Sequence, residues 1–227
     1  MAAILFDFNG VIVNDEPQHC DALIATLAEY GIELDRERYY QEYLGFDDRE
    51  CFRFTFTRHG RPTDAEAIAD AIERKAAYYE RAIRRSMELV PGAVEFVRAA
   101  AAEGITLAVV SGALRREIDL VLSVAGIRAH FVHVTAAEDV SACKPDPQGY
   151  LRAYRALGDA AGSCVVIEDS LPGLAAARAA GLPCAMLATS HPRTELGGAG
   201  ADSIWDDFVG RRPAELPWNN GKGNGRH

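Results

Sequence analysis

Short runs of apolar residues alternate with amphipathic segments at the start of the chain and again after residue 90. The runs are long enough for single strands and lie at residues 3–8, 105–110, 130–134, 164–167 and 184–187. The segments between the later runs have helical spacing, and several end at a glycine such as Gly104 or Gly181. Continuous apolar strands that alternate with helices are typical of a parallel sheet covered on both faces. The pattern therefore predicts an α/β fold with a doubly wound, Rossmann-like sheet of five parallel strands.

Residues 15–88 have a different pattern, because strand signals are missing there. Apolar positions at helical spacing predict helices at residues 17–30, 36–44, 48–59 and 64–86, separated by Gly31, Gly45 and Gly60. An all-helical insertion between the first two strands of a sheet is expected to form a cap domain. We predict a core domain of residues 1–14 and 89–213, a cap of residues 15–88 and a disordered tail of residues 214–227, which is polar and rich in glycine.

Composition narrows the possible classes of protein. The 227 residues are 48% hydrophobic, which is enough for a sizeable core, and carry a formal net charge of −9. An acidic chain without a basic patch is not expected to bind nucleic acid. The five cysteines form no CxxC pair, the start of the chain lacks a signal-peptide pattern, and no apolar run is long enough to span a membrane. We expect a cytoplasmic protein that does not enter a membrane.

Polar residues follow the predicted strands at the ends where parallel sheets bind ligands. Asp7 and Asn9-Gly10 end the first strand, Ser111-Gly112 the second, and Glu168-Asp169 the fourth, while Lys144 lies in the loop after the third. A carboxylate, a hydroxyl, an amine and a pair of acids at one sheet edge suit phosphoryl transfer. Ser170 is also a candidate N-cap for the helix that follows.

Each of these groups has a chemical part in such a transfer. Asp7 can attack phosphorus and form an aspartyl phosphate. Mg²⁺ would offset the repulsion between two anions, held by Asp7, Asp169, Glu168 and the backbone carbonyl of residue 9. Ser111 and Lys144 can bind the remaining phosphate oxygens.

These motifs resemble those of the haloacid-dehalogenase superfamily, in the subgroup of β-phosphoglucomutase and related sugar-phosphate phosphatases. The resemblance covers residues 3–208 and rests on four motifs in order: Asp7-Phe8-Asn9-Gly10-Val11, Val110-Ser111-Gly112, Lys144-Pro145-Asp146 and Ile167-Glu168-Asp169-Ser170. It implies a Rossmann-like core with an all-helical (C1-type) cap. It implies that Asp7 is the nucleophile and a Mg²⁺ ligand, that Ser111 and Lys144 bind phosphate, and that Glu168 and Asp169 complete the metal site. Gly10, Gly112 and Ala113 would line the substrate site.

The resemblance extends to the cap. The segment Leu44-Gly45-Phe46-Asp47-Asp48-Arg49-Glu50 is similar to the family's substrate-facing loop, with Arg49 as the substrate contact. Glu73-Arg74-Lys75 with Tyr79 resembles the cap helix whose lysine reaches the site, and His19 lies where relatives carry a hinge histidine. Charged residues of a cap are commonly exposed to solvent without a function, and this is the alternative interpretation of Arg49 and Lys75.

Position 9 departs from the family pattern, in which an Asp two residues after the nucleophile transfers the proton. Asn9 can form hydrogen bonds but cannot give and take a proton. Four interpretations follow: another group such as Glu16 or His19 carries the proton; the enzyme is slow and its phosphoenzyme persists; the protein binds ligand without turnover; or the Asn was introduced by design. The simultaneous presence of the other site residues favours the first two.

We therefore predict a monomeric, Mg²⁺-dependent phosphatase acting on a small phosphorylated metabolite such as a sugar phosphate. The alternatives are a catalytically impaired phosphometabolite-binding protein and a β-phosphoglucomutase-like mutase. The mutase needs the missing acid even more than a hydrolase does. The Glu168-Asp169 pair argues against haloacid dehalogenation, which requires no Mg²⁺.

Overall fold

The structure is a computed structural model that describes residues 2–43, 46–158 and 162–218. The chain divides into two compact units. The core unit comprises residues 1–14 and 88–227, and the insert unit comprises residues 15–87.

The core unit is built on one sheet of six parallel strands in the order β3-β2-β1-β4-β5-β6. The strands are β1 (Ala2–Phe6), β2 (Thr106–Val110), β3 (Phe131–Thr135), β4 (Ser163–Glu168), β5 (Cys184–Leu187) and β6 (Ser203–Trp205). The predicted parallel α/β sheet is confirmed, and the five predicted strands are all present. The sixth strand was not predicted, because β6 has only three residues and begins with a polar one.

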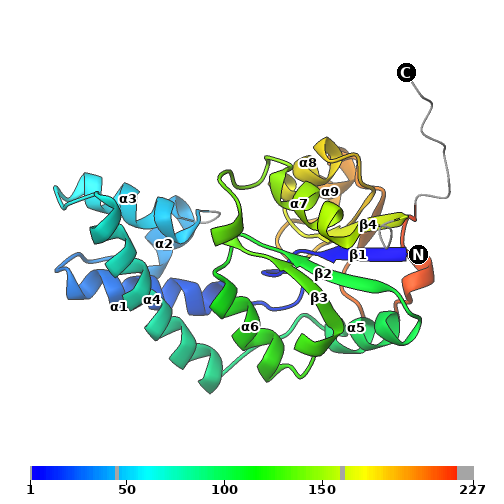
Figure 1. Ribbon diagram of the computed structural model, residues 1–227. Coiled ribbons are helices and arrows are strands. Elements are labelled where there is room, and N and C mark those ends of the chain that lie inside the picture. Colours follow the sequence, from blue (N-terminus) through cyan, green and yellow to red (C-terminus); the bar gives the residue numbers. More distant parts are fainter. Residues whose placement is uncertain (1, 44–45, 159–161, 219–227) are drawn as a thin grey trace. The chain divides into compact units, whose positions relative to one another are not determined.

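Helices cover both faces of this sheet (Figure 1). On one side lie α5 (Ala93–Ala102) and α6 (Arg115–Val124); on the other lie α7 (Gln148–Leu157), α8 (Leu171–Ala179) and α9 (Arg193–Ala199). Alternate residues of a strand point to opposite faces. In β1, Leu5 packs in a cluster with residues of α7 and α8, whereas the Phe6 ring contacts Phe96 of α5 at 6.3 Å between centroids. Burial on both faces explains why the strands have continuous apolar sequences.

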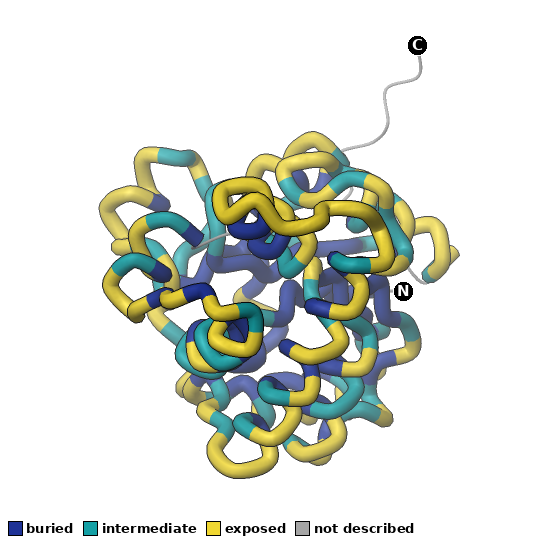
Figure 2. Tube along the Cα trace, turned by 90° about the vertical axis from the view of Figure 1, so that its left-hand side faces the viewer, coloured by how far each residue is buried: buried dark blue, intermediate teal, exposed yellow. Residues whose placement is uncertain are grey.

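The insert unit is helical, as predicted. It contains α1 (Glu16–Glu29), α2 (Arg36–Glu42), α3 (Asp48–Arg58) and α4 (Ala65–Arg85). Asp35, Asp47 and Asp64 cap three of these helices by accepting a hydrogen bond from a backbone N–H in the first turn. A core of Leu23, Leu27, Tyr39, Phe52, Phe56, Ile68 and Ala71, among others, holds the helices together. Figure 2 shows buried stretches of the chain alternating with exposed ones.

The chain leaves the core unit and returns to it at neighbouring points. The backbone N–H of Asn14 donates to the carbonyl of Glu88 at 2.8 Å, and Val13 pairs with Leu89 in an antiparallel bridge. The two ends of the insert are therefore joined by backbone hydrogen bonds that belong to the core.

Part of the tail predicted to be disordered lies within the described residues. Pro213–Glu215 forms a 3-10 helix, Leu216 is buried, and the indole of Trp218 donates to the carbonyl of Pro213 at 2.9 Å. The remainder of the predicted tail, residues 219–227, lies outside the described residues. Among the helices that the structure describes, no helix has the length and apolar character to cross a membrane.

Candidate active site

The end of β1 places Asp7 at the carboxyl edge of the sheet. The N–H of Asp7 donates to the carbonyl of Ile167 at 2.9 Å, which continues the β1–β4 ladder by one residue. The chain then turns sharply, and the N–H of Ile12 donates to the carbonyl of Phe8 at 2.8 Å. Gly10 has a positive φ of 71°, and a Cβ there would lie 1.9 Å from Oδ2 of Asp169. Only glycine therefore fits at this position.

The carboxyl ends of the neighbouring strands bring further polar groups to Asp7. Nζ of Lys144 lies 2.5 Å from Oδ1 of Asp7 and 2.6 Å from Oε1 of Glu168. Asp7, Glu168 and Asp169 each offer a carboxylate oxygen, and these oxygens lie within 4.8 Å of one another. The structure thus brings together the predicted nucleophile, the predicted phosphate-binding lysine and the predicted metal-binding acids.

Ser111 and Asn9 meet beside this cluster. The Ser111 hydroxyl donates to Oδ1 of Asn9 at 3.4 Å and accepts from the N–H of Ala113 at 3.0 Å. A Cβ on Gly112 would meet nothing within 4 Å, so the chain next to Ser111 is open. The turn after β2 therefore presents a hydroxyl toward the nucleophile loop, with free space at Gly112.

Burial shifts the titration of the three acids. The pKa of Asp7 is raised from 3.8 to about 7, because burial disfavours the charged form and Lys144 compensates only in part. The pKa of Asp169 is raised well above its usual value by burial and by the charges of Glu168 and Asp7. Burial alone would raise the pKa of Glu168, but Lys144 holds it below its usual range. Burial would lower the pKa of Lys144, but Asp7 and Glu168 together raise it.

Glu168 differs from the other two acids in its hydrogen bonds. Its Oε1 accepts from Lys144 Nζ and from the Tyr150 hydroxyl at 2.9 Å. Its Oε2 accepts from the N–H of Asp169 at 2.9 Å, and from the N–H and hydroxyl of Ser170 at 3.0 Å each. A carboxylate offers about four lone-pair positions, so these five contacts occupy Glu168 fully. Its position is fixed, and it holds Lys144 in turn.

The sequence analysis missed three residues at this edge. The Ser190 hydroxyl donates to Oδ2 of Asp169, and the Thr189 hydroxyl donates to the carbonyl of Gly10 at 2.6 Å. Both follow β5, so the strand-end rule could have found them, but uncharged hydroxyls in a polar loop give a weak signal. Tyr150 is fully buried, with its ring centroid 5.2 Å from Nζ of Lys144. An aromatic residue at helical spacing looks like an ordinary core residue.

The predicted cap residues belong to the insert unit and have partners there. Nδ1 of His19 lies 2.8 Å from Nζ of Lys75, which also forms an ion pair with Asp48. Lys75 is buried, and the His19 ring stacks on Tyr79 with 4.4 Å between centroids. Arg49 is exposed on α3. Leu44 and Gly45 of the predicted substrate-facing loop lie outside the described residues.

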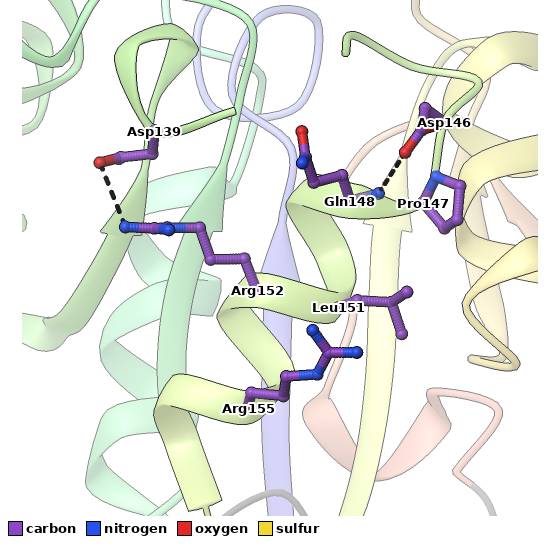
Figure 3. Close-up of a pocket in the computed structure, with 7 residues that line it drawn as sticks. All are labelled: Asp139, Asp146, Pro147, Gln148, Leu151, Arg152 and Arg155. Atoms are coloured by element: carbon purple, nitrogen blue, oxygen red, sulfur yellow. Dashed lines mark hydrogen bonds and ion pairs between the residues drawn. The ribbon is translucent and has the colours of Figure 1, made fainter. Parts of the chain in front are cut away.

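A separate pocket of about 440 Å³ lies at the start of α7 (Figure 3). It is lined by Asp139, Asp146, Pro147, Gln148, Leu151, Arg152 and Arg155. None of these side chains belongs to the carboxylate cluster, although Asp146 lies only two residues after Lys144.

Comparison with known proteins identifies the class. A model of the haloacid dehalogenase-like hydrolase family matches residues 1–181, and the chain belongs to this family of enzymes. The predicted superfamily and hydrolase class are thereby confirmed.

Individual relatives narrow the comparison. The chain is 28% identical over 211 residues to a phosphoglycolate phosphatase of Rhodospirillum rubrum, a match that covers 91% of this chain and 88% of that protein. It resembles the crystal structure of CbbY from Rhodobacter sphaeroides in complex with phosphate, with a TM-score of 0.79, 30% identity, and coverage of 92% of this chain and 95% of that one. The same figures hold for a CbbY variant, in which an Asp is replaced by Asn, in complex with xylulose-1,5-bisphosphate.

One relative is much longer. The chain is 30% identical over 222 residues to the chloroplastic protein SUPPRESSOR OF QUENCHING 1 of Arabidopsis thaliana, a match that covers 92% of this chain but only 20% of that protein.

Proposed function

We propose that this enzyme is a Mg²⁺-dependent phosphatase that acts on a small phosphorylated metabolite, such as a sugar phosphate, through an aspartyl phosphate on Asp7. The observation that carries the proposal is the contact of Asp7 with Lys144 inside a cluster of three buried carboxylates. A relative named phosphoglycolate phosphatase and a relative crystallised with phosphate and with a sugar bisphosphate support this substrate class.

The residues of the core unit account for the two chemical steps. In the first, a carboxylate oxygen of Asp7 forms a bond to phosphorus while the ester P–O bond breaks, and the leaving oxygen takes up a proton from solvent. In the second, a water oxygen attacks the same phosphorus and gives up a proton to solvent, the bond between phosphorus and Asp7 breaks, and inorganic phosphate leaves. Lys144 and the Ser111 hydroxyl bind the phosphate oxygens, where negative charge develops, and the contacts of Lys144 with Asp7 and of Ser111 with Asn9 support these roles.

The acidic cluster fits a divalent cation. Three buried carboxyl groups face one ammonium group, so ionisation of all three calls for a further positive charge, and carboxylate oxygens are the ligands that Mg²⁺ prefers. When bound, Mg²⁺ offsets the charge of the substrate phosphate and of the nucleophile. We assign Asp7, Asp169 and the backbone carbonyl of Asn9 as its ligands. Glu168 was also predicted as a ligand; its full set of hydrogen bonds favours the role of holding Lys144.

Asn9 sets the rate in this proposal. Its amide cannot protonate the leaving group, and general acid–base catalysis is worth roughly 10²–10⁴-fold. The substitutes considered from the sequence have other partners in the insert unit: Glu16 accepts from the Tyr39 hydroxyl at 2.6 Å, and His19 contacts Lys75. We therefore favour a slow phosphatase that turns over esters with good leaving groups and whose phosphoenzyme persists. Ligand binding without turnover is the second candidate, because the CbbY variant with Asn in place of an Asp was crystallised with a sugar bisphosphate.

Phosphate release from p-nitrophenyl phosphate and from a panel of sugar phosphates, with and without Mg²⁺, tests the proposal. We expect Mg²⁺-dependent release by the natural chain, no release by Asp7→Asn, and faster release by Asn9→Asp, most of all for poor leaving groups. Turnover by Asn9→Asp alone would support the binding protein instead. Undiminished turnover by Asp7→Asn would contradict the assignment of the nucleophile.

A further inference from the structure

Lys144 is presented by a loop that has little hydrophobic anchorage. The loop runs from η2 (Ala137–Asp139) to α7, and most residues from Ser141 to Asp146 are exposed or only half-buried. Apolar burial therefore contributes little to its conformation. The amine of Lys144 must nevertheless stay in contact with both Asp7 and Glu168. Some polar interaction has to define the path of this loop.

Gln148 supplies that interaction. Its side-chain oxygen Oε1 accepts from the N–H of Ser141 at 2.7 Å and from the N–H of Ala142 at 3.1 Å. The Ser141 hydroxyl lies 3.2 Å from both side-chain polar atoms of Gln148. Gln148 thus fastens the first residues of the loop to the first turn of α7, with Lys144 between the two attachment points.

The backbone of Gln148 also binds to the loop, on the other side of Lys144. Its N–H donates to Oδ1 of Asp146 at 2.8 Å (Figure 3). The N–H of Asp146 donates to the carbonyl of Cys143 at 3.0 Å. The residues on both sides of Lys144 are therefore tied to one another through Gln148. Because α7 packs on the sheet that carries Asp7, this tie relates the loop to the nucleophile.

We propose that Gln148 is a positioning residue for Lys144, acting through the Oε1 atom that closes the loop. This inference rests on the proposed function, in which Lys144 binds the transferred phosphate. Among the described residues, no hydrogen bond joins Gln148 to Asp7, Glu168 or Asp169, and Gln148 lines the pocket at the start of α7. Its substitution should change the placement of Lys144 without disturbing the buried cluster directly.

A matched pair of variants isolates the Oε1 atom. Gln148→Glu keeps an acceptor oxygen at the same distance along the side chain, whereas Gln148→Met has a similar length and no such acceptor. We expect Gln148→Met to lower kcat/KM for p-nitrophenyl phosphate by roughly 10–100-fold, the scale of a misplacement by about 1 Å. Gln148→Glu should stay close to the natural chain, and both variants should keep its melting temperature, because residue 148 is exposed.

Two measurements make the test independent of turnover. Hydrogen exchange of the Ser141 and Ala142 amides should be faster in Gln148→Met than in Gln148→Glu. The affinity for inorganic phosphate in the presence of Mg²⁺, measured by calorimetry, should fall in Gln148→Met but not when the same change is made on a Lys144→Met background. That double-variant cycle separates an effect of Gln148 that acts through Lys144 from a general loss of order in the loop.

The outcomes are distinct. Unchanged exchange in Gln148→Met, or faster exchange with unchanged phosphate affinity and kcat/KM, would overturn the role of Gln148. The role would also be overturned if Gln148→Met lowered the phosphate affinity equally in the chain with Lys144 and in Lys144→Met. The same holds if Gln148→Glu lowered the phosphate affinity as much as Gln148→Met. If the natural chain releases no phosphate from any substrate, the proposed function fails, while exchange and phosphate binding still decide the inference.

Discussion

The raised pKa of Asp7 predicts an unusual dependence of stability on pH in the absence of metal. The pKa of this carboxyl is 3.8 in an unfolded chain and about 7 in the folded one, chiefly because the group is buried. Between about pH 4 and about pH 7 the folded protein therefore binds more protons at this position than the unfolded chain. The contribution of Asp7 to stability is fully present below the lower value and is lost as the pH rises toward the upper one.

The magnitude follows from the difference between the two values. One pH unit corresponds to about 1.4 kcal/mol, so a difference of about three units is worth about 4 kcal/mol over the whole window. Within the window, Asp7 alone lowers the free energy of unfolding by about 1.4 kcal/mol per pH unit. Asp169 also has a raised pKa and changes stability in the same direction.

Urea unfolding in EDTA, at several pH values between about 4.5 and about 6.5, measures this slope. Asp7→Asn is the matched control, because the amide has nearly the same shape and does not titrate. We expect the free energy of unfolding of Asp7→Asn to fall less steeply with pH, by about 1.4 kcal/mol per pH unit. Removal of the Asp7 charge also lowers the pKa of Asp169, which flattens the pH dependence further. Saturating Mg²⁺ should flatten the slope of the natural chain, because it favours the ionised carboxylate. Equal slopes for the natural chain and Asp7→Asn would refute the reasoning.

Two further predictions concern the residues around Asp169. Gly10→Ala should destabilise the protein by about 1–3 kcal/mol and weaken Mg²⁺ binding, because a Cβ at φ 71° would overlap Asp169. Gly112 has open space around it, so Gly112→Ala should leave the free energy of unfolding nearly unchanged in the same urea titration. Equal stability of the two variants would contradict this. Ser190→Ala should weaken Mg²⁺ binding by roughly 10–100-fold in calorimetry, since the hydroxyl orients a carboxylate assigned to the metal, and Ser190→Thr should restore it. An unchanged dissociation constant in Ser190→Ala would remove Ser190 from the metal site.

The fold was predictable because its local signals and its packing agree. The strands β1, β2, β4 and β5 are buried along nearly their whole length and so have almost continuous apolar sequences, and glycines such as Gly104 and Gly181 end the helices where the pattern stops. The edge strand β3 leaves Val132 exposed and His133 half-buried. The last strand, β6, is short and partly exposed, so it lacked that signal. The insert was predictable as helical for the same reason, through the spacing of residues such as Leu23 and Phe52.

The site was predictable where polar residues directly follow a strand or where a sequence motif marks them, as with Ser111 and Lys144. Asp7 and the Glu168-Asp169 pair stand out at strand ends, and the parallel sheet brings those ends together. Contacts between residues far apart in the chain were beyond such reasoning. The pairing of His19 with Lys75 and the contact of Tyr150 with Glu168 depend on how whole helices pack, which no local spacing encodes.

The hydrogen bond between Asn14 and Glu88 has a consequence for how far the insert can change without disturbing the sheet. Backbone hydrogen bonds within the core hold the two ends of the insert together. For the core, the insert is therefore a loop whose ends are already fixed. The entropy of closing a loop grows only slowly with its length, so helices can be lengthened, exchanged or deleted between these two residues at little cost to the sheet. A chain in which a short linker connects Asn14 to Glu88 should retain the six-stranded sheet and its acidic cluster. The sheet with its acidic cluster and the variable insert are thus separated at the backbone contacts that join Val13 and Asn14 to Glu88 and Leu89.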